Sequence, residues 1–172
     1  VSLARAASAT GRTFGAAVNT RMLAPRSPGR LMALQQCASV TSEWSFKWDR
    51  LSPTRDRFDF ADADRIANFA RQNGKRMRGH TLLWHLGMPR WANTLLRETR
   101  DWEHVRRYFQ GVMPRYADIV DEWDVVNEPI DVGSRSDGLR ANQFLQAFGP
   151  SYIERAFWSA REISPRTRLF LN

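Results

Sequence analysis

The sequence is poor in cysteine, in lysine and in long apolar runs. Cys37 is its only cysteine, which excludes an internal disulfide, and its place after an apolar stretch predicts a small buried core residue. No apolar run approaches the roughly 18 residues that cross a bilayer, so a membrane is not an expected partner. Lys47 and Lys75 are the only lysines among 26 basic residues, and arginine therefore carries nearly all of the positive charge.

The net charge of +8 suggests nucleic acid as one candidate partner. The arginines are scattered along the whole chain, however, and no basic run is interleaved with aromatic residues. A solvated, arginine-rich surface explains this pattern better, so we expect no nucleic-acid partner. The 172 residues also include seven tryptophans. Indole rings fill cores, and they stack on flat apolar ligand faces such as sugar rings.

Short apolar stretches alternate with amphipathic segments along the chain. Strands are predicted at residues 14–18, 38–43, 75–85, 119–128 and 168–172, and helices at residues 27–37, 63–73, 102–116 and 153–163. A strand followed by a helix, repeated four times before a lone strand, is typical of parallel strands covered by helices. The 172 residues are therefore interpreted as one α/β domain, with residues 1–12 as an extension.

An open doubly wound sheet and part of a closed barrel both fit this alternation. No glycine-rich phosphate loop follows the first predicted strand, which argues against a dinucleotide-binding site. Polar groups instead stand where successive strands end: Glu43 on the second, His80 and His85 on the third, and Asn127 and Glu128 on the fourth. This layout is typical of the active site of a (β/α)8 barrel. The sequence thus predicts an incomplete TIM barrel, with about five parallel strands and four helices of it.

The stretch "DEWDVVNEPI" ends a buried strand on a carboxyl group. Pro129 has no N–H to donate, so it stops the ladder directly after Glu128. An apolar wall disfavours the ionised form of a carboxyl group, which suits a general acid. The neighbouring Asn127 can form a hydrogen bond to a substrate hydroxyl. The alternative is an exposed glutamate in a loop.

The other polar strand ends suggest sugar contacts rather than a metal. His80 and His85 are five residues apart and would point to opposite faces of a strand, so a shared metal is not expected. A neutral imidazole can bond to hydroxyls or to a carboxylate, although a satisfied core histidine is the alternative. Glu43 and Lys47 are either an ordinary surface pair or a polar clamp for sugar hydroxyls.

Several motifs in order resemble glycoside hydrolase family 10, whose best-known members are endo-1,4-β-xylanases. They are "SVTSEWSFKWD", "RFDFADADRIANFARQNGKRMRGHTLLWH", "PRW", "WDVVNEPI" and "RLFLN", and the resemblance covers about residues 11–172. It implies a (β/α)8 barrel that hydrolyses β-1,4-xylan with retention and without a cofactor. It maps the general acid/base onto Glu128, and it maps sugar contacts onto Glu43, Lys47, His80, Trp84 and Asn127.

A retaining glycosidase needs a second carboxylate roughly 5 Å from the first, to act as nucleophile. In the family this glutamate lies on the seventh strand, and the sequence predicts only five. We therefore expect the amino-terminal half of a xylanase barrel, inactive when isolated and monomeric when full length. A non-catalytic carbohydrate-binding fragment is the alternative. Because xylan is too large to enter a cell, a secreted or periplasmic location is expected.

Two residues depart from the pattern that the resemblance implies. The family usually has asparagine where this chain has Trp44, and glutamine where it has Gly87. Both positions contact sugars on the non-reducing side of the cleaved bond. Losing two hydrogen-bonding groups and gaining an indole is expected to weaken or reshape that recognition, in favour of a decorated or different β-glycan.

Overall fold

A single parallel sheet of five strands, in the order β1-β2-β3-β4-β5, forms the centre of the computed structural model, which describes all residues from Val1 to Asn172. The strands are β1 (Gly15–Val18), β2 (Ser39–Ser42), β3 (Arg76–Trp84), β4 (Val120–Asn127) and β5 (Arg168–Leu171). Each predicted strand is present within two residues of its expected ends. The predicted parallel α/β architecture is therefore confirmed.

Helices connect every pair of successive strands. Helix α1 (Leu3–Ser8) precedes β1. The connecting helices are α2 (Pro28–Gln36), α3 (Trp48–Leu51), α4 (Ala61–Gln72), α5 (Arg90–Thr99), α6 (Glu103–Val112), the 3-10 helix η1 (Pro114–Tyr116), α7 (Gln143–Phe148) and α8 (Tyr152–Ile163). The four predicted helices correspond to α2, α4, α6 and α8. The sequence interpretation missed α3, α5 and α7, which lie in the connections after β2, β3 and β4. None of the helices combines the length and apolar character needed to cross a membrane.

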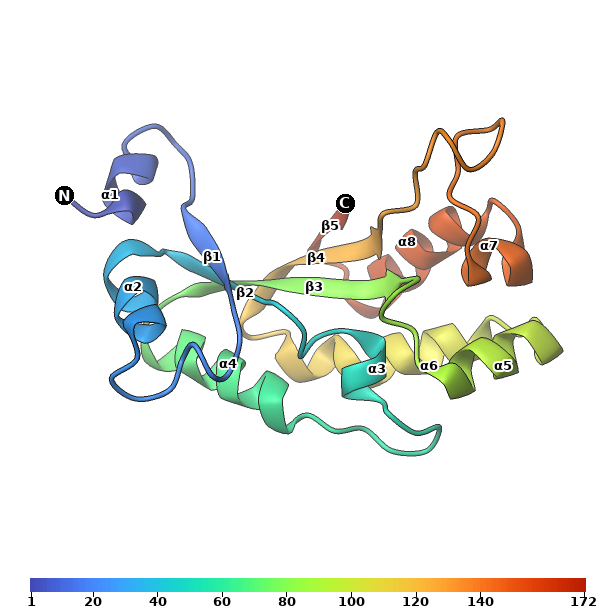
Figure 1. Cartoon of the computed structure of the whole chain (residues 1–172), viewed down its shortest axis with the longest axis horizontal. Coiled ribbons are helices and arrows are strands. Elements are labelled where there is room, and N and C mark those ends of the chain that lie inside the picture. Colours follow the sequence, from blue (N-terminus) through green and yellow to red (C-terminus); the bar gives the residue numbers. More distant parts are fainter.

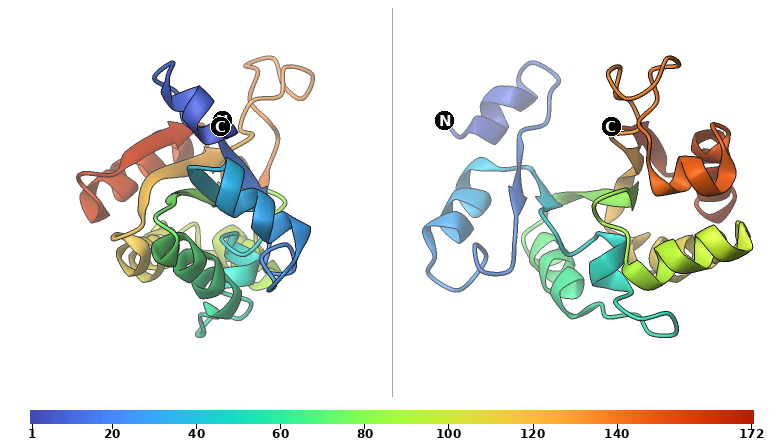
Figure 2. Two further views of the ribbon diagram at one scale, coloured as in Figure 1. Left: turned by 90° about the vertical axis from the view of Figure 1, so that its left-hand side faces the viewer. Right: turned by 45° about the vertical axis from the view of Figure 1, so that its right-hand side comes forward.

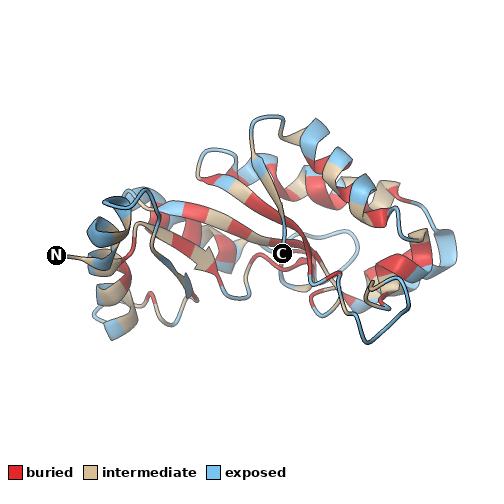
Figure 3. Cartoon of the chain, turned by 90° about the horizontal axis from the view of Figure 1, so that it is seen from above, coloured by how far each residue is buried: buried red, intermediate tan, exposed pale blue.

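The sheet is covered on one side only. In Figure 1 the helices α3, α4, α5 and α6 lie below the strands, and the two turned views show the sheet curving with β1 and β5 at its margins (Figure 2). Burial follows this arrangement, because the enclosed residues lie along the central strands and on the sides of the helices that face them (Figure 3). β1 and β5 each pair with one neighbour, so both outer edges are free.

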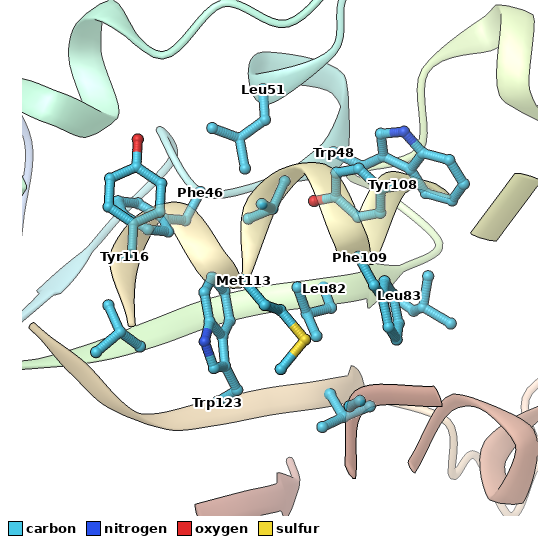
Figure 4. Close-up of a cluster of buried hydrophobic side chains, with 14 of the residues drawn as sticks. Phe46, Trp48, Leu51, Leu82, Leu83, Tyr108, Phe109, Met113, Tyr116 and Trp123 are labelled. Atoms are coloured by element: carbon cyan, nitrogen blue, oxygen red, sulfur yellow. The ribbon is translucent and has the colours of Figure 1, made fainter. Parts of the chain in front are cut away.

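The core lies between β3, β4 and the helices that cover them (Figure 4). Leu82 and Leu83 of β3 are fully buried there. Trp48 stacks on Tyr108 with ring centroids 4.3 Å apart and planes 5° from parallel. Cys37 is 1% exposed, as expected for a small core residue. This packing holds the central strands rigidly, so that their carboxyl ends can present side chains in defined positions.

Local signals in the sequence account for the helix ends. The Ser27 hydroxyl accepts a hydrogen bond from the backbone N–H of Arg30, and Pro28 occupies the first turn of α2. In the connection between β2 and β3, Gly74 adopts φ of +59° after Asn73, the C-cap of α4. A residue with a side chain is strained in that left-handed conformation, which is why glycine closes the helix.

Candidate active site

Side chains from the ends of β1 and β2 are joined by direct hydrogen bonds. Asn19 follows β1, and its Nδ2 donates to Oε2 of Glu43 over 2.7 Å. Glu43 follows β2, and its backbone carbonyl accepts a hydrogen bond of 2.8 Å from Nζ of Lys47. The first of these bonds orients a carboxylate that the sequence singled out. The second anchors the ammonium group of Lys47 beside it.

Lys47 continues this set of contacts to the ends of β3 and β4. Its Nζ lies 4.1 Å from the ring centroid of Trp44 and 4.3 Å from that of Trp84, so the ammonium group sits between two indoles. Trp84 in turn donates from Nε1 to Oε2 of Glu128 over 2.9 Å. A continuous series of contacts therefore runs from Asn19 to Glu128, across the ends of four strands.

The charged side chain of Lys47 is largely shielded from solvent. The residue is only 5% exposed. Burial lowers the pKa of the Lys47 ammonium, and the carboxylates of Asp49, Glu43 and Glu128 offset part of that effect. The ammonium thus places a desolvated positive charge near the Glu128 carboxyl group.

Glu128 lies directly after β4 in a left-handed backbone conformation, with φ of +54°. This conformation is uncommon for a residue with a side chain. Hydrogen bonds hold it on both sides: the N–H of Glu128 donates to the Asn172 carbonyl over 2.6 Å, and Arg140 Nε donates to the Glu128 carbonyl over 2.8 Å. Glu128 is exposed, and its carboxylate accepts a hydrogen bond from the Trp84 indole.

Beneath these contacts lies an ionic cluster of Arg78, His80 and Asp124. His80 Nδ1 is 2.8 Å from Oδ2 of Asp124, and Nε of Arg78 donates to both carboxylate oxygens over 3.2 and 3.1 Å. Burial raises the pKa of Asp124, but the hydrogen bonds from His80 and Arg78 outweigh it and hold that pKa below its usual value. The ionised carboxylate can only accept, so Nδ1 of His80 carries the hydrogen and Nε2 is left for another partner.

Sequence reasoning missed Arg78 and Asp124. The signal that could have found them is the two-residue period of a strand, because Arg78 and His80 then share one face of β3. In the observed register Arg78 lies opposite Glu122, and His80 lies opposite Asp124. Charged residues recurring at every second position of two interior strands indicate a polar cluster rather than a solvated surface.

Asn127 and His85 lie on the margins of the site. Asn127 is 4% exposed, and its Oδ1 accepts a hydrogen bond of 2.7 Å from Nδ2 of Asn172. Nδ1 of His85 is buried without a hydrogen-bond partner, and burial together with the charge of Arg140 lowers the His85 pKa. No group of three or more His, Cys, Asp or Glu side chains is arranged to hold a metal ion.

A cavity of about 500 Å3 opens where these strands end. Its lining includes Glu43, Lys47, His80 and Asp124. Three of the six proposed site residues therefore share one cavity. Trp84, Asn127 and Glu128 do not line it, and Trp84 and Glu128 are connected to it through the contact between Lys47 and the Trp84 ring. This arrangement can bind hydroxyl groups in the cavity, while the Glu128 carboxyl group lies outside the cavity lining, bonded to Trp84.

Comparisons with known proteins show which family the chain resembles over nearly its whole length. The family model for Glycosyl hydrolase family 10 matches residues 2–172. Endo-1,4-beta-xylanase 3 of Hypocrea jecorina is 33% identical over 162 residues, which are 94% of this chain and 46% of that protein. The crystal structure of xylanase B from Clostridium stercorarium F9 aligns with a TM-score of 0.88 at 31% identity, over 99% of this chain and 54% of that one. The chain thus spans about half the length of the relatives that it matches.

Proposed function

The chain belongs to Glycosyl hydrolase family 10, and we propose that it supplies the general acid/base half of a retaining endo-1,4-β-xylanase active site. The observation that carries the proposal is the hydrogen bond of 2.9 Å from Trp84 Nε1 to Glu128 Oε2, next to the buried Lys47. The relatives support xylan as the substrate, since the Hypocrea jecorina protein is an endo-1,4-β-xylanase and one solved neighbour, at a TM-score of 0.88 and 28% identity, is in complex with xylotriose.

Glu128 has two tasks in this proposal. In the first step its carboxylic acid gives a proton to the glycosidic oxygen, while the bond from that oxygen to C1 breaks and a second carboxylate bonds to C1. In the second step the Glu128 carboxylate takes a proton from a water molecule, whose oxygen bonds to C1 and displaces the second carboxylate. Trp84 occupies Oε2, which leaves Oε1 of Glu128 to carry the proton.

The remaining site residues hold the sugar. Glu43 accepts hydrogen bonds from hydroxyls, and Asn19 keeps its carboxylate in place. Lys47 uses one N–H on the Glu43 carbonyl and retains two donors. His80 turns Nδ1 to Asp124, so Nε2 is the ring nitrogen left to bond to a sugar hydroxyl. The indole of Trp84 provides a flat face for a sugar ring, and Asn127 donates from its amide group.

The second carboxylate has to come from outside these 172 residues. The sheet has five strands, and the family resemblance places the nucleophile on the seventh. We propose that residues 13–172 form the amino-terminal half of one barrel domain and that residues 1–12 extend it. We place the complete enzyme outside the cytoplasm, secreted or periplasmic, because of the size of its substrate. We also propose that the full-length enzyme is a monomer. One solved neighbour is an intracellular xylanase from Thermoanaerobacterium saccharolyticum, so compartment does not follow from family membership.

The acid/base role can be tested in a fusion of this chain with the remaining barrel of the Clostridium stercorarium xylanase. We expect Glu128→Ala to lower turnover of xylan by roughly 100- to 10,000-fold, because the leaving oxygen is no longer protonated. Activity on an aryl xylobioside with a good leaving group should return when azide is added. The product should be a β-xylobiosyl azide, since azide needs no general base to attack the covalent intermediate.

Glu154→Ala is the matched control, because Glu154 lies on α8 and bonds to the exposed Trp158. It should leave xylan turnover unchanged. Full turnover of xylan by the Glu128→Ala fusion would contradict the acid/base assignment. Loss of activity without recovery or azide product would contradict it equally, since that result belongs to a nucleophile or a structural residue.

A second candidate function is carbohydrate binding without hydrolysis. It is favoured by one observation, namely that the isolated chain holds the proposed sugar contacts but only one carboxylate of the catalytic pair. Calorimetric titration of the isolated chain with xylo-oligosaccharides measures this function. The fusion distinguishes the two candidates, because a fragment adapted only to binding would not restore turnover that depends on Glu128.

A further inference from the structure

The loop between β4 and α7 closes on itself through backbone contacts. It leaves the end of β4, rises away from the sheet in Figure 1 and descends to α7. Ile130 pairs with Leu139 in an isolated antiparallel bridge. The N–H of Arg140 donates to the Pro129 carbonyl over 2.7 Å. The two ends of the loop are therefore joined without the help of the Arg140 side chain.

The guanidinium group of Arg140 instead reaches back to the proposed acid/base. Its Nε donates to the Glu128 carbonyl over 2.8 Å. The residue after Glu128 is Pro129, which has no N–H, so this carbonyl is the only hydrogen-bonding group of the peptide bond between them. Arg140 therefore holds the peptide bond that follows Glu128 by its one available atom.

The orientation of this peptide bond influences where the Glu128 side chain points. Glu128 has φ of +54°, a conformation that persists in a residue with a side chain only where its surroundings hold the backbone. The Asn172 carbonyl holds the N–H of Glu128, and Arg140 holds its carbonyl. If Glu128 relaxed toward an ordinary φ, its Cβ would turn and carry the carboxyl group away from Trp84 Nε1.

Asp131 fixes the plane of the Arg140 guanidinium. Nη1 of Arg140 lies 3.2 Å from Oδ2 of Asp131, and Oδ1 of Asp131 accepts a hydrogen bond of 3.3 Å from the N–H of Gly133. Because a guanidinium is planar, contacts at Nε and Nη1 together set its orientation. The Arg140 and Asp131 side chains are 30% and 37% exposed, and an ion pair so open to solvent contributes little to stability. The pair is therefore better suited to directing the hydrogen bond to Glu128 than to stabilising the loop.

We propose that Arg140 is a positioning residue for proton transfer. By holding the Glu128 carbonyl it keeps the left-handed backbone in place, and the backbone in turn aims the carboxyl group at the leaving oxygen. Arg140 does not touch the reacting atoms in this proposal. The inference rests on the proposed function, because it gives Arg140 a role only through the acid/base Glu128.

The kinetic test uses the fusion described above and two aryl β-xylobiosides. Dinitrophenolate leaves without a proton, whereas phenolate needs one from Glu128. We expect Arg140→Gln to lower kcat/KM for the phenyl substrate by roughly 10- to 100-fold, because a displaced acid loses part of its effect. For the dinitrophenyl substrate kcat/KM should stay within about twofold, since the first step then needs no acid.

This split separates positioning from a general structural role. Damage to the fold would lower kcat/KM for both substrates alike, and an equal loss therefore overturns the proposal, as does no loss for either. Arg140→Lys keeps the charge but not the planar pair of donors, so it should recover only part of the phenyl activity. Full recovery in Arg140→Lys would assign the effect to charge alone and would also overturn the proposal.

Arg135→Gln is the matched control, because Arg135 is an arginine of the same loop that bonds to an aspartate but not to Glu128. Its Nε and Nη2 donate to Asp137 over 3.0 and 2.8 Å, and its side chain is 44% exposed. Both kcat/KM values should be unchanged in this variant. A loss in Arg135→Gln equal to that in Arg140→Gln would show that any disturbance of the loop has the same effect.

A second measurement uses the 172-residue chain and needs no catalysis. In a nitrogen-15 correlation spectrum the indole N–H of Trp84 is assigned by its absence in Trp84→Phe, and Glu128→Ala shows its position without the hydrogen bond. In Arg140→Gln this signal should move toward that position, and in Arg135→Gln it should not. The indole signals of the buried Trp48 and Trp123 should stay in place, which checks the core. If they move, Arg140→Lys gives the reading instead.

The positioning role and the acid/base assignment fail separately. The Trp84 signal reports where the Glu128 carboxylate lies, whereas the azide product reports what that carboxylate does. An azide product in Glu128→Ala together with an unmoved Trp84 signal in Arg140→Gln overturns the role of Arg140 alone. A moved Trp84 signal without an azide product overturns the acid/base assignment, and the catalytic meaning of Arg140 with it.

Discussion

Asp124 and Lys47 are the two buried charged residues, and their charges are compensated in different ways. Lys47 has one hydrogen bond, to a backbone carbonyl, and two aromatic rings around it. Asp124 is matched by Arg78 and His80, and its side chain is 3% exposed. Removing one member of such a buried pair leaves a charge without compensation, which costs more than the pair contributed.

Asp124→Asn is expected to lower the free energy of unfolding at pH 7 by about 3 kcal/mol, because Arg78 loses its main partner. The folded-state pKa of Asp124 lies below its value in the unfolded chain. Its contribution is therefore complete above the unfolded pKa of about 4 and is lost as the pH falls through the folded pKa. Urea denaturation between pH 7 and pH 3 measures the difference between the two proteins.

Asp118→Asn is the control for this measurement, because Asp118 pairs with Arg71 at a distance of 2.6 Å but its side chain is 60% exposed. Asp118→Asn should lower the free energy of unfolding by no more than about 1 kcal/mol. A difference between the parent chain and Asp124→Asn that stays constant down to pH 3 would show that the Asp124 charge does not contribute to stability.

Strand β3 depends on a residue without a side chain at its centre. Gly79 lies opposite Trp123 of β4 in the sheet. A Cβ atom at position 79 would lie 2.3 Å from the Trp123 ring, which is 1% exposed and has little room to move. The close approach of β3 to this indole explains why the strand contains glycine next to His80.

Gly79→Ala is expected to lower the free energy of unfolding by about 1–3 kcal/mol, because the Trp123 ring has to shift within a packed core. The urea midpoint measures this cost. Gly133→Ala is the control, since a Cβ there meets only an Asp131 carboxylate oxygen at 3.7 Å. Equal midpoints for the two variants would mean that the core beside β3 accommodates the added methyl group freely.

The chain as a whole is a sheet with two free edges and one face without helices (Figures 1 and 2). It places Glu128 at the end of β4 and offers no strand on which the resemblance would place a nucleophile. In the proposed function, this part of the barrel contributes substrate binding and proton transfer, and the nucleophile is contributed from outside these 172 residues.

The isolated chain is therefore expected to release no reducing sugar from xylan, because one carboxylate cannot carry out double displacement. A reducing-sugar assay on purified chain, with Glu128→Gln alongside, measures this directly. Both proteins should give the same baseline. Sugar release by the parent chain that disappears in Glu128→Gln would show that the 172 residues are catalytically complete.

Much of this site could be predicted from local patterns. Glu43 and Glu128 stand where apolar strand patterns stop, and parallel strands bring such ends together at one edge. His80 was expected at a strand end but lies inside β3, four residues before its last residue, Trp84. The helices α2 and α4 could be predicted from the sequence because a cap, an apolar stripe or a closing glycine marks them. The four-residue α3 could not be predicted, because it is too short to show helical periodicity.

The alternation of elements, the ends of most strands and the proposal of Glu128 as acid/base follow from the sequence, because each depends on residues that are neighbours along the chain. The placement of Lys47 between two indoles and the Trp84 hydrogen bond that leaves Oε1 of Glu128 available were decided only in the folded protein. Each of them joins segments from different strands. Which side chains meet there depends on strand register and on the left-handed backbone at Glu128, and neither leaves a local mark in the sequence.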